Sequence, residues 1–316
     1  MTANSMVNVF PSMMRVRFSW RVMSRRRTKI YINLSFPQLA AKYAVLPVDG
    51  VGLMRAEFFA LSLGKHPRQL LAEGGSAAFI ECFSTGLKKV AEAFWPRPII
   101  YRTLDLKSNE YRGLIGGEQF EEEEENPMLG LRGCSRYVRD PECFRLELQA
   151  IKRAREAGYS NIRLMLPFVR FPRELEHCRR LIEEEGLLTD GMELWMMAEV
   201  PSNVFLIEKF LPLVSGVSIG SNDLTQLILG IDRDNRKLAA EFDERDEAVM
   251  LAMRQIVRTC RACGKPVSIC GNAPSKYPEL AAKLIEWGIT SLSVFPEVFE
   301  RTVDIVEGIE AQLTSG

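Results

Sequence analysis

The sequence alternates short apolar runs with longer segments of helical character, and this alternation restricts the fold more than any other feature. Repeated β-α units form parallel sheets, and eight such units have the size of a closed barrel. The pattern therefore predicts an α/β fold, a (β/α)8 TIM barrel that forms a single domain over residues 28–316. The eight apolar runs are residues 48–55, 98–104, 128–132, 162–169, 193–200, 216–220, 266–270 and 291–295.

Helices are expected between these runs. Their predicted positions are residues 142–157, 172–185, 204–210, 247–263 and 278–287. A doubly wound open sheet is the competing architecture. Such a sheet usually carries a Gly-rich turn after its first strand. Neither GxGxxG nor GxxxxGK[ST] occurs in the sequence, which favours the barrel.

Residues 1–27 have a different composition from the rest of the chain. They contain six arginines and no acidic residue, and they show no clear amphipathic period, so we expect a basic, disordered tail. Organelle-targeting segments are rich in arginine and poor in acids, which is one interpretation. The other interpretation is an upstream translated stretch, left by a truncated or misassigned start.

The overall composition favours no nucleic-acid or membrane partner. Forty-one basic residues balance 41 acidic residues, so any anion site must be local. No apolar run has the roughly 20 residues that a bilayer-spanning helix needs. The seven cysteines are scattered and odd in number, unlike a disulfide framework, and this predicts a reducing, cytoplasmic location.

Polar residues recur at the ends of the apolar runs, where a barrel builds its active site. Glu199 closes the fifth run and Asp223 follows the sixth. Two carboxylates on neighbouring strand ends suit Mg²⁺, which completes its shell with water and substrate oxygens. Alone, either carboxylate would fit a helix cap or a solvated loop. The turn of Gly220, Ser221 and Asn222 offers N–H groups to a substrate carboxylate.

Four arginines belong to the same rim and together predict a phosphate site, because their planar forks match phosphate oxygens. A surface ion pair is the alternative for any one of them. In that case Glu57 would pair with Arg55, and Asp232 or Asp234 would pair with Arg233. The four arginines are Arg55, Arg102, Arg132 and Arg233.

Cys270 ends the seventh run, in SICGNAP, where a thiol can exchange a proton with a bound ligand. A buried, inert cysteine is the alternative. Cys260 and Cys263 form a CxxC inside a predicted helix, without a second pair, which argues against a metal site there. The run of glutamates at 121–125 is expected to be a solvated acidic loop.

Seven ordered sequence blocks resemble the C-terminal barrel of phosphoenolpyruvate synthases, over about residues 28–316. These enzymes belong to the wider family that uses phosphoenolpyruvate (PEP), together with pyruvate phosphate dikinase. The blocks are VDGVGLMRAEFF, RTLDLKSNEYRGLIGGE, EEENPMLGLRG, MLPFVR, MMAEVPSN, SIGSNDLTQLILGIDRDN and SICGNAPS.

The resemblance implies roles for the matching residues. Glu199 and Asp223 would hold Mg²⁺, and Cys270 would add or remove the proton at C3 of pyruvate. The four rim arginines and the turn at 220–222 would hold PEP or pyruvate. The implied reaction is enolisation of pyruvate followed by phosphoryl transfer from a phosphohistidine, which an ATP-grasp domain charges. A homodimer follows by analogy with the family.

The sequence also departs from this family. It contains no ATP-grasp domain and no phosphohistidine domain, and neither of its histidines, His66 and His177, matches the phosphorylated one. Phe295 stands where relatives usually have asparagine. The leading hypothesis is therefore a partial enzyme that needs a separate phosphohistidine or ATP-grasp protein. The alternatives are a non-catalytic metabolite-binding or assembly domain, and a lyase that uses the same enolate chemistry.

Overall fold

Eight parallel strands close into a barrel in the computed structural model, which describes residues 26–315. Each strand pairs with its sequence neighbours, and the last pairs with the first. This architecture confirms the predicted (β/α)8 fold. The strands are β1 (Lys29–Leu34), β2 (Gly50–Arg55), β3 (Ile99–Arg102), β4 (Ile162–Leu166), β5 (Leu194–Ala198), β6 (Gly216–Ile219), β7 (Val267–Ile269) and β8 (Ser291–Val294).

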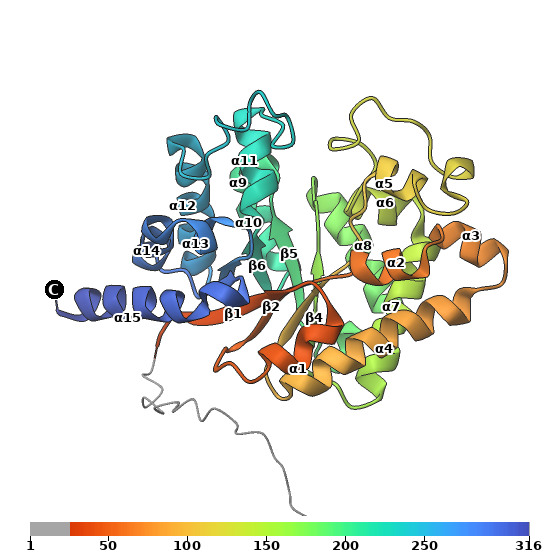
Figure 1. Ribbon diagram of the computed structural model, residues 1–316, viewed down its shortest axis with the longest axis horizontal. Helices are drawn as coiled ribbons and strands as arrows, with labels where there is room; N and C mark the ends of the chain where they lie inside the picture. Colours follow the sequence, from red (N-terminus) through yellow and green to blue (C-terminus); the bar gives the residue numbers. More distant parts are fainter. Residues whose placement is uncertain (1–25, 316) are drawn as a thin grey trace, which may run out of the picture.

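Helices surround the barrel, and the segments after β3 and β6 project from the same end of it (Figure 1). The predicted helices at 142–157, 172–185, 247–263 and 278–287 form within one residue of those bounds, while 204–210 falls in two short helices. The α-helices are α1 (Ala40–Tyr43), α2 (Glu57–Leu63), α3 (Pro67–Ala72), α4 (Ser76–Phe94), α5 (Ser108–Arg112), α6 (Cys134–Arg139), α7 (Pro141–Glu156), α8 (Pro172–Glu184), α9 (Pro201–Phe205), α10 (Ile207–Phe210), α11 (Ser221–Leu229), α12 (Glu247–Ala262), α13 (Ala273–Lys276), α14 (Pro278–Trp287) and α15 (Phe299–Ser315).

The strand prediction is wrong at two places near the start of the barrel. The first strand is β1, with the β-branched and aromatic sequence KIYINL, which the prediction left out. Residues 128–132 are not a strand but a loop after β3. Side chains take the place of strand pairing there, because Glu124 accepts a hydrogen bond from the backbone N–H of Leu131.

The start of the described chain is tied to the barrel and to its last helix. The backbone N–H groups of Arg27 and Thr28 donate to Glu310 of α15, at 3.0 and 2.7 Å. Arg26 lies 3.8 Å from Asp49, in the turn before β2. The disordered tail predicted for residues 1–27 otherwise lies outside the described residues.

Two apolar layers build the barrel. The larger one lies between the strands and the helices, with Ile30, Val217 and Leu292 among its fully buried members. A smaller cluster fills the barrel itself and comes from β2, β3, β4 and β5 and from the end of β7: Leu53, Ile100, Met165, Trp195, Met197 and Cys270. Interior layers of this kind make the barrel a packed core, so a ligand can enter only at a rim.

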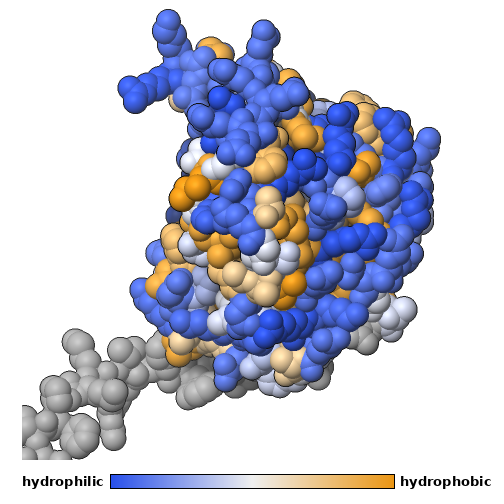
Figure 2. Space-filling view, turned by 90° about the vertical axis from the view of Figure 1, so that its right-hand side faces the viewer, coloured by the Kyte–Doolittle hydropathy of each residue, from blue (hydrophilic) through white to orange (hydrophobic). Residues whose placement is uncertain are grey.

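The side of the barrel shown in Figure 2 is largely hydrophilic, and its hydrophobic residues lie between polar ones. Within residues 26–315, no helix combines the length and the apolar character that crossing a bilayer requires.

Two glycines within helices allow a matched stability test. A Cβ at Gly86 of α4 would lie 2.2 Å from Cε1 of Phe59, a buried ring, whereas a Cβ at Gly308 of α15 would meet nothing within 4 Å. Gly86→Ala should therefore lower the free energy of unfolding by about 1–3 kcal/mol. Gly308→Ala should raise it by up to about 1 kcal/mol, through helix propensity. Denaturant unfolding measures both, and equal changes in the two variants would contradict this packing.

Candidate active site

The polar end of the barrel holds a cavity of about 230 Å³ at the carboxyl ends of the strands. Its lining combines cations and carboxylates with a thiol, above the apolar floor formed by Leu53 and Met197. Nine of the ten residues predicted for the site line this cavity. They are Arg55, Arg102, Arg132, Glu199, Gly220, Asn222, Asp223, Arg233 and Cys270.

Ser221 is the predicted residue whose side chain does not line the cavity. It is fully buried at the start of α11, and its hydroxyl donates a hydrogen bond to the carboxylate of Glu244. Ser221 therefore anchors the turn from within, while its neighbours Gly220 and Asn222 face the cavity.

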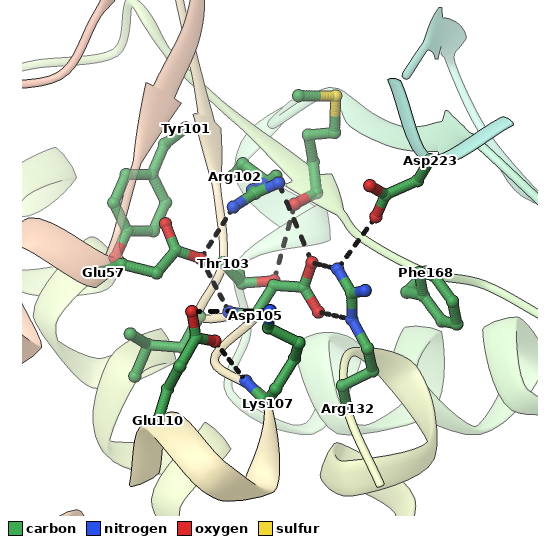
Figure 3. Close-up of polar contacts among 12 residues, drawn as sticks. Glu57, Tyr101, Arg102, Thr103, Asp105, Lys107, Glu110, Arg132, Phe168 and Asp223 are labelled. Atoms are coloured by element: carbon green, nitrogen blue, oxygen red, sulfur yellow. Dashed lines mark hydrogen bonds and ion pairs between the residues drawn. The ribbon is translucent and has the colours of Figure 1, made fainter. Parts of the chain in front are cut away.

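Asp105 is the central anion of the site, although the sequence prediction did not include it. Its side chain is fully buried after β3 and receives two hydrogen bonds from Arg132, from Nε at 3.0 Å and from Nη2 at 2.6 Å. Arg102 approaches the same carboxylate to 3.8 Å. Figure 3 shows Asp105 between the two guanidiniums. One carboxylate thus fixes two of the predicted phosphate-binding arginines.

Asp105 and Arg132 each stabilise the charged form of the other. Burial raises the pKa of Asp105, but the charge and hydrogen bonds of Arg132 outweigh burial and bring this pKa below its usual range. The pKa of Arg132 lies above its usual range, because Asp105 and Asp223 offset the burial of its guanidinium. Both groups are therefore ionised at neutral pH.

Glu57, at the start of α2, holds the second arginine. One of its oxygens, Oε1, accepts from Nη2 of Arg102 and from the backbone N–H of Asp105, both at 2.8 Å. The ion pair that the sequence suggested for Glu57 was with Arg55, so that alternative is wrong. Its other oxygen, Oε2, is buried without a hydrogen-bond partner, as is Nε of Arg102.

Behind the strand, a second buried acid supports the same segment. Glu147 of α7 accepts from the hydroxyl of Tyr101 at 2.7 Å and from the backbone N–H of Leu104 at 3.1 Å. Burial raises the pKa of Glu147 to about 8. Residues 101–105, which carry Arg102 and Asp105, are thus held from both sides of the barrel wall.

Glu199 directly follows β5, and Asp223 lies in the first turn of α11, after β6. Both residues are buried. Oε1 of Glu199 accepts from the backbone N–H of Phe168 at 2.7 Å, which orients the carboxylate. Asp223 pairs with Arg132 at 3.0 Å and with Arg233 at 3.2 Å. Burial, with the Asp223 and Asp105 charges, raises the pKa of Glu199 to about 8.

These two carboxylates fit a hard divalent cation. A carboxylate with a raised pKa, close to other buried carboxylates, gains when a cation compensates its charge. Among residues 26–315, no group of three or more His, Cys, Asp or Glu side chains is placed to hold a metal. A Mg²⁺ held by Glu199 and Asp223 would therefore keep several positions for water and substrate oxygens, as this ion commonly does.

Arg55 and Arg233 lie on the open side of the site. Both also line an adjoining cavity of about 340 Å³, together with Asn222, Asn272 and Phe295. Phe295 is 41% exposed there, so the departure from the family pattern changes the rim and not the buried cluster. Burial, with the Arg102 charge, lowers the pKa of Arg55. An anion bound at Arg55 would offset the repulsion from Arg102.

Cys270 lies at the end of β7 on the floor of the cavity, with its side chain in the interior cluster. It is 2% exposed, and its thiol donates to the carbonyl of Ile219 at 3.7 Å. Burial raises the pKa of this thiol to about 11. The thiol is therefore protonated at neutral pH and belongs to the floor of the cavity.

The expected solvated acidic loop at 121–125 is wrong for two of its members. Glu121 is buried, where it contacts Nε2 of His66 at 3.0 Å and accepts two hydrogen bonds from Arg136. Glu124 accepts from the hydroxyl of Ser108 at 2.6 Å. These contacts compensate the charges of Glu121 and Glu124, which the sequence predicted to be solvated. They also hold the segment that leads to Arg132.

A comparison with protein families decides the identity of the chain. The sequence pattern described as "PEP-utilising enzyme, PEP-binding domain" matches residues 14–310. The chain belongs to this family. The resemblance inferred from the seven sequence blocks is thereby confirmed.

Individual PEP-utilising relatives show the same relationship. The chain is 49% identical over 294 residues to a probable phosphoenolpyruvate synthase of Staphylothermus marinus, with 90% of this chain and 35% of that protein covered. It is 47% identical to the phosphoenolpyruvate synthase of Aeropyrum pernix (90% and 36%) and 42% identical to that of Pseudomonas aeruginosa (85% and 37%). The chain thus spans about a third of the length of these relatives.

The role of Asp105 in this PEP-binding domain is open to a direct test. Asp105→Asn leaves the Arg132 guanidinium buried with a weaker partner, so the free energy of unfolding at pH 7 should fall by about 3–5 kcal/mol. Asp234→Asn, at an exposed acid in the loop after α11, is the control and should change little. Denaturant unfolding of the two variants gives the comparison. A loss at Asp105 no larger than in the control would contradict its central role.

Proposed function

We propose that this domain binds PEP or pyruvate together with Mg²⁺ and catalyses the enolisation half of a pyruvate, water dikinase-like reaction. With a phosphohistidine supplied by another domain or protein, the same site would complete phosphoryl transfer: the N–P bond of the phosphohistidine breaks and a P–O bond to the enolate oxygen forms. The observation that supports this proposal is the convergence of four arginines, four buried carboxylates and one thiol on a single cavity.

The arginines divide into an inner and an outer pair. Arg102 and Arg132 are buried and fixed by Glu57 and Asp105, so they present their charge without reorganisation. Arg55 and Arg233 are more open and lie where a phosphoryl group would enter. Loose phosphoryl transfer depends mainly on positioning and charge neutralisation, and four guanidiniums exceed what a carboxylate alone requires.

Glu199 and Asp223 would hold the Mg²⁺ of this site. The bound ion supplies positive charge beside the carboxylate and the developing enolate oxygen of the substrate. Gly220 and Asn222 line the same cavity at the start of α11, where the first N–H groups of the helix suit a substrate carboxylate.

Cys270 would act as the acid and base at C3. In the direction of the enolate, its thiolate takes a proton from the methyl group of pyruvate. The electrons of the C–H bond then form the C2–C3 double bond, and the π electrons of the carbonyl group move to its oxygen. In the reverse direction, the thiol returns a proton to C3. The raised pKa of the thiol suits this return step, since the proton stays on sulfur until a strongly basic carbon accepts it.

The remaining expectations form part of the same proposal. The phosphoryl donor is a phosphohistidine carried by an ATP-grasp-linked domain or a separate protein, and the barrel is expected to form a homodimer in the cytoplasm. A metabolite-binding domain without catalysis is the second candidate. Proton exchange at pyruvate separates the two functions.

Enolisation predicts proton-to-deuterium exchange at the pyruvate methyl group, which NMR measures directly in the presence of Mg²⁺. Cys270→Ala should lower the exchange rate by about 10²- to 10⁴-fold, because it removes the acid-base group. Cys260→Ala is the matched control, since Cys260 is a buried cysteine of α12 outside the cavity. Measurable PEP binding without exchange in the unaltered protein would refute catalysis and leave the binding function.

The pH dependence of this exchange follows from the raised thiol pKa. Since the pKa of Cys270 is about 11, the thiolate is a small fraction at pH 7 and grows as the pH rises. With Mg²⁺ saturating, the exchange rate should increase by about tenfold per pH unit between pH 7 and 9. Rates that are flat or that fall over this range would show that another group removes the proton.

A further inference from the structure

The loop at residues 126–133 carries Arg132 into the cavity but contains no helix or strand. Its own backbone hydrogen bonds run from the N–H of Leu129 to the carbonyl of Asn126 and from that of Gly130 to the carbonyl of Pro127, and neither involves Arg132. Arg170, beyond the end of β4, supplies much of what is missing. Its guanidinium donates to the carbonyls of Leu129 at 3.0 Å and Gly130 at 2.6 Å.

The same guanidinium reaches both ends of the turn into α6. It donates to the hydroxyl of Ser135 at 2.7 Å and lies 3.5 Å from the carbonyl of Arg132 itself. Arg170 is in turn fixed by its own backbone, because its N–H donates to Glu174 at 3.0 Å and its carbonyl accepts from Ser202 at 2.7 Å. A planar fork of five donors suits this set of acceptors, and a lysine would not satisfy them together.

Phe168 joins the two arginines. The guanidinium carbon of Arg132 lies 4.0 Å from the centre of the Phe168 ring, and that of Arg170 lies 4.6 Å from it. The Phe168 backbone has φ +47°, a conformation that costs energy for a residue with a side chain. Its N–H donates to Glu199 from this conformation, so the ring and the peptide of one residue contact two separate parts of the site.

Gly133 keeps the loop tight against this residue. A Cβ at Gly133 would lie 2.7 Å from Cβ of Phe168 and from the carbonyl oxygen of Pro167, and its φ is +54°. The loop backbone thus packs directly on the end of β4. A shift of the loop would move the ring of Phe168 and, through its N–H, the carboxylate of Glu199.

We propose that Arg170 is a positioning residue of this site: it fixes the 126–133 loop so that Arg132 meets the substrate, and it acts on Glu199 through Phe168. The inference rests on the proposed function, since it concerns how the PEP site is held. Arg170 itself does not line the cavity; it lines a separate surface pocket with Arg173 and Phe171.

Arg170→Met keeps the aliphatic stem and removes the fork. In calorimetry with PEP and Mg²⁺, this variant should bind PEP roughly ten- to a hundredfold more weakly than the unaltered protein, because Arg132 loses its fixed position. The control is Arg173→Met, three residues on, at an exposed arginine whose guanidinium lies 4.2 Å from the centre of the Phe171 ring. It should bind PEP like the unaltered protein.

Two further measurements separate positioning from a general loss of stability. Backbone amides of residues 126–133 should exchange hydrogen faster in Arg170→Met, while those of β6 and β7 should not. In a double-mutant cycle, Arg170→Met should cause little additional loss of PEP affinity once Arg132 has been replaced by methionine. If Arg170→Met does not fold, Arg170→Lys replaces it, and a smaller loss of affinity in the same direction is expected.

The outcomes distinguish the two proposals. If the unaltered protein binds no PEP, the proposed function fails. If it binds PEP and Arg170→Met matches Arg173→Met in affinity and loop exchange, the function stands and the positioning role is overturned. Equal, additive losses from Arg170 and Arg132 would likewise overturn it, because they would show that Arg170 acts independently of Arg132.

Discussion

The structure depends on how four guanidiniums share one small cavity. Like charges at this distance repel, and each would be costly to bury without a partner. Asp105 compensates the charge of two of these arginines, since its carboxylate accepts two hydrogen bonds from Arg132 and faces Arg102. Asp223 then joins Arg132 to Arg233. The site is thus an alternating chain of charges across the barrel mouth, and its order comes from the protein before any ligand binds.

The barrel explains why this chain of charges can exist. Its members come from the ends of β2, β3, β5 and β6 and from the loop before α6, far apart in the sequence. Parallel strands bring their carboxyl ends to one rim, and the packed interior below that rim excludes water. The carboxylates that compensate the arginines arrive by the same route: Glu57 follows β2, and Asp105 follows β3. Arg102, Arg132 and Arg233 therefore meet their partners at the mouth of the barrel.

Strand periodicity and strand-end polarity were enough to predict the barrel and nine residues of the cavity lining, because both follow from local patterns. β1 was missed since KIYINL directly follows the basic segment, and MLGLR was mistaken for a strand because an apolar run resembles one until its backbone partners are known. Asp105 was missed, and Glu57 was assigned to Arg55 in place of Arg102, for a different reason. Nothing in RTLD or MRAE states that an acid points inward, so only the three-dimensional pairing with Arg102 and Arg132 assigns their roles.

The two ion pairs of Asp223 affect how the proposed ligands would bind. In the absence of ligands, the Asp223 carboxylate neutralises Arg132 and Arg233 together. A phosphoryl group would compete for the two arginines, and a divalent cation would compete for the carboxylate. If either ligand arrived alone, it would leave some of these charges with fewer partners, whereas the two together exchange one set of ion pairs for another. With the ligands of the proposed function, the charge arrangement would thus favour joint occupation of the cavity by an anionic substrate and a divalent cation, and the raised pKa of Glu199 would add to that preference.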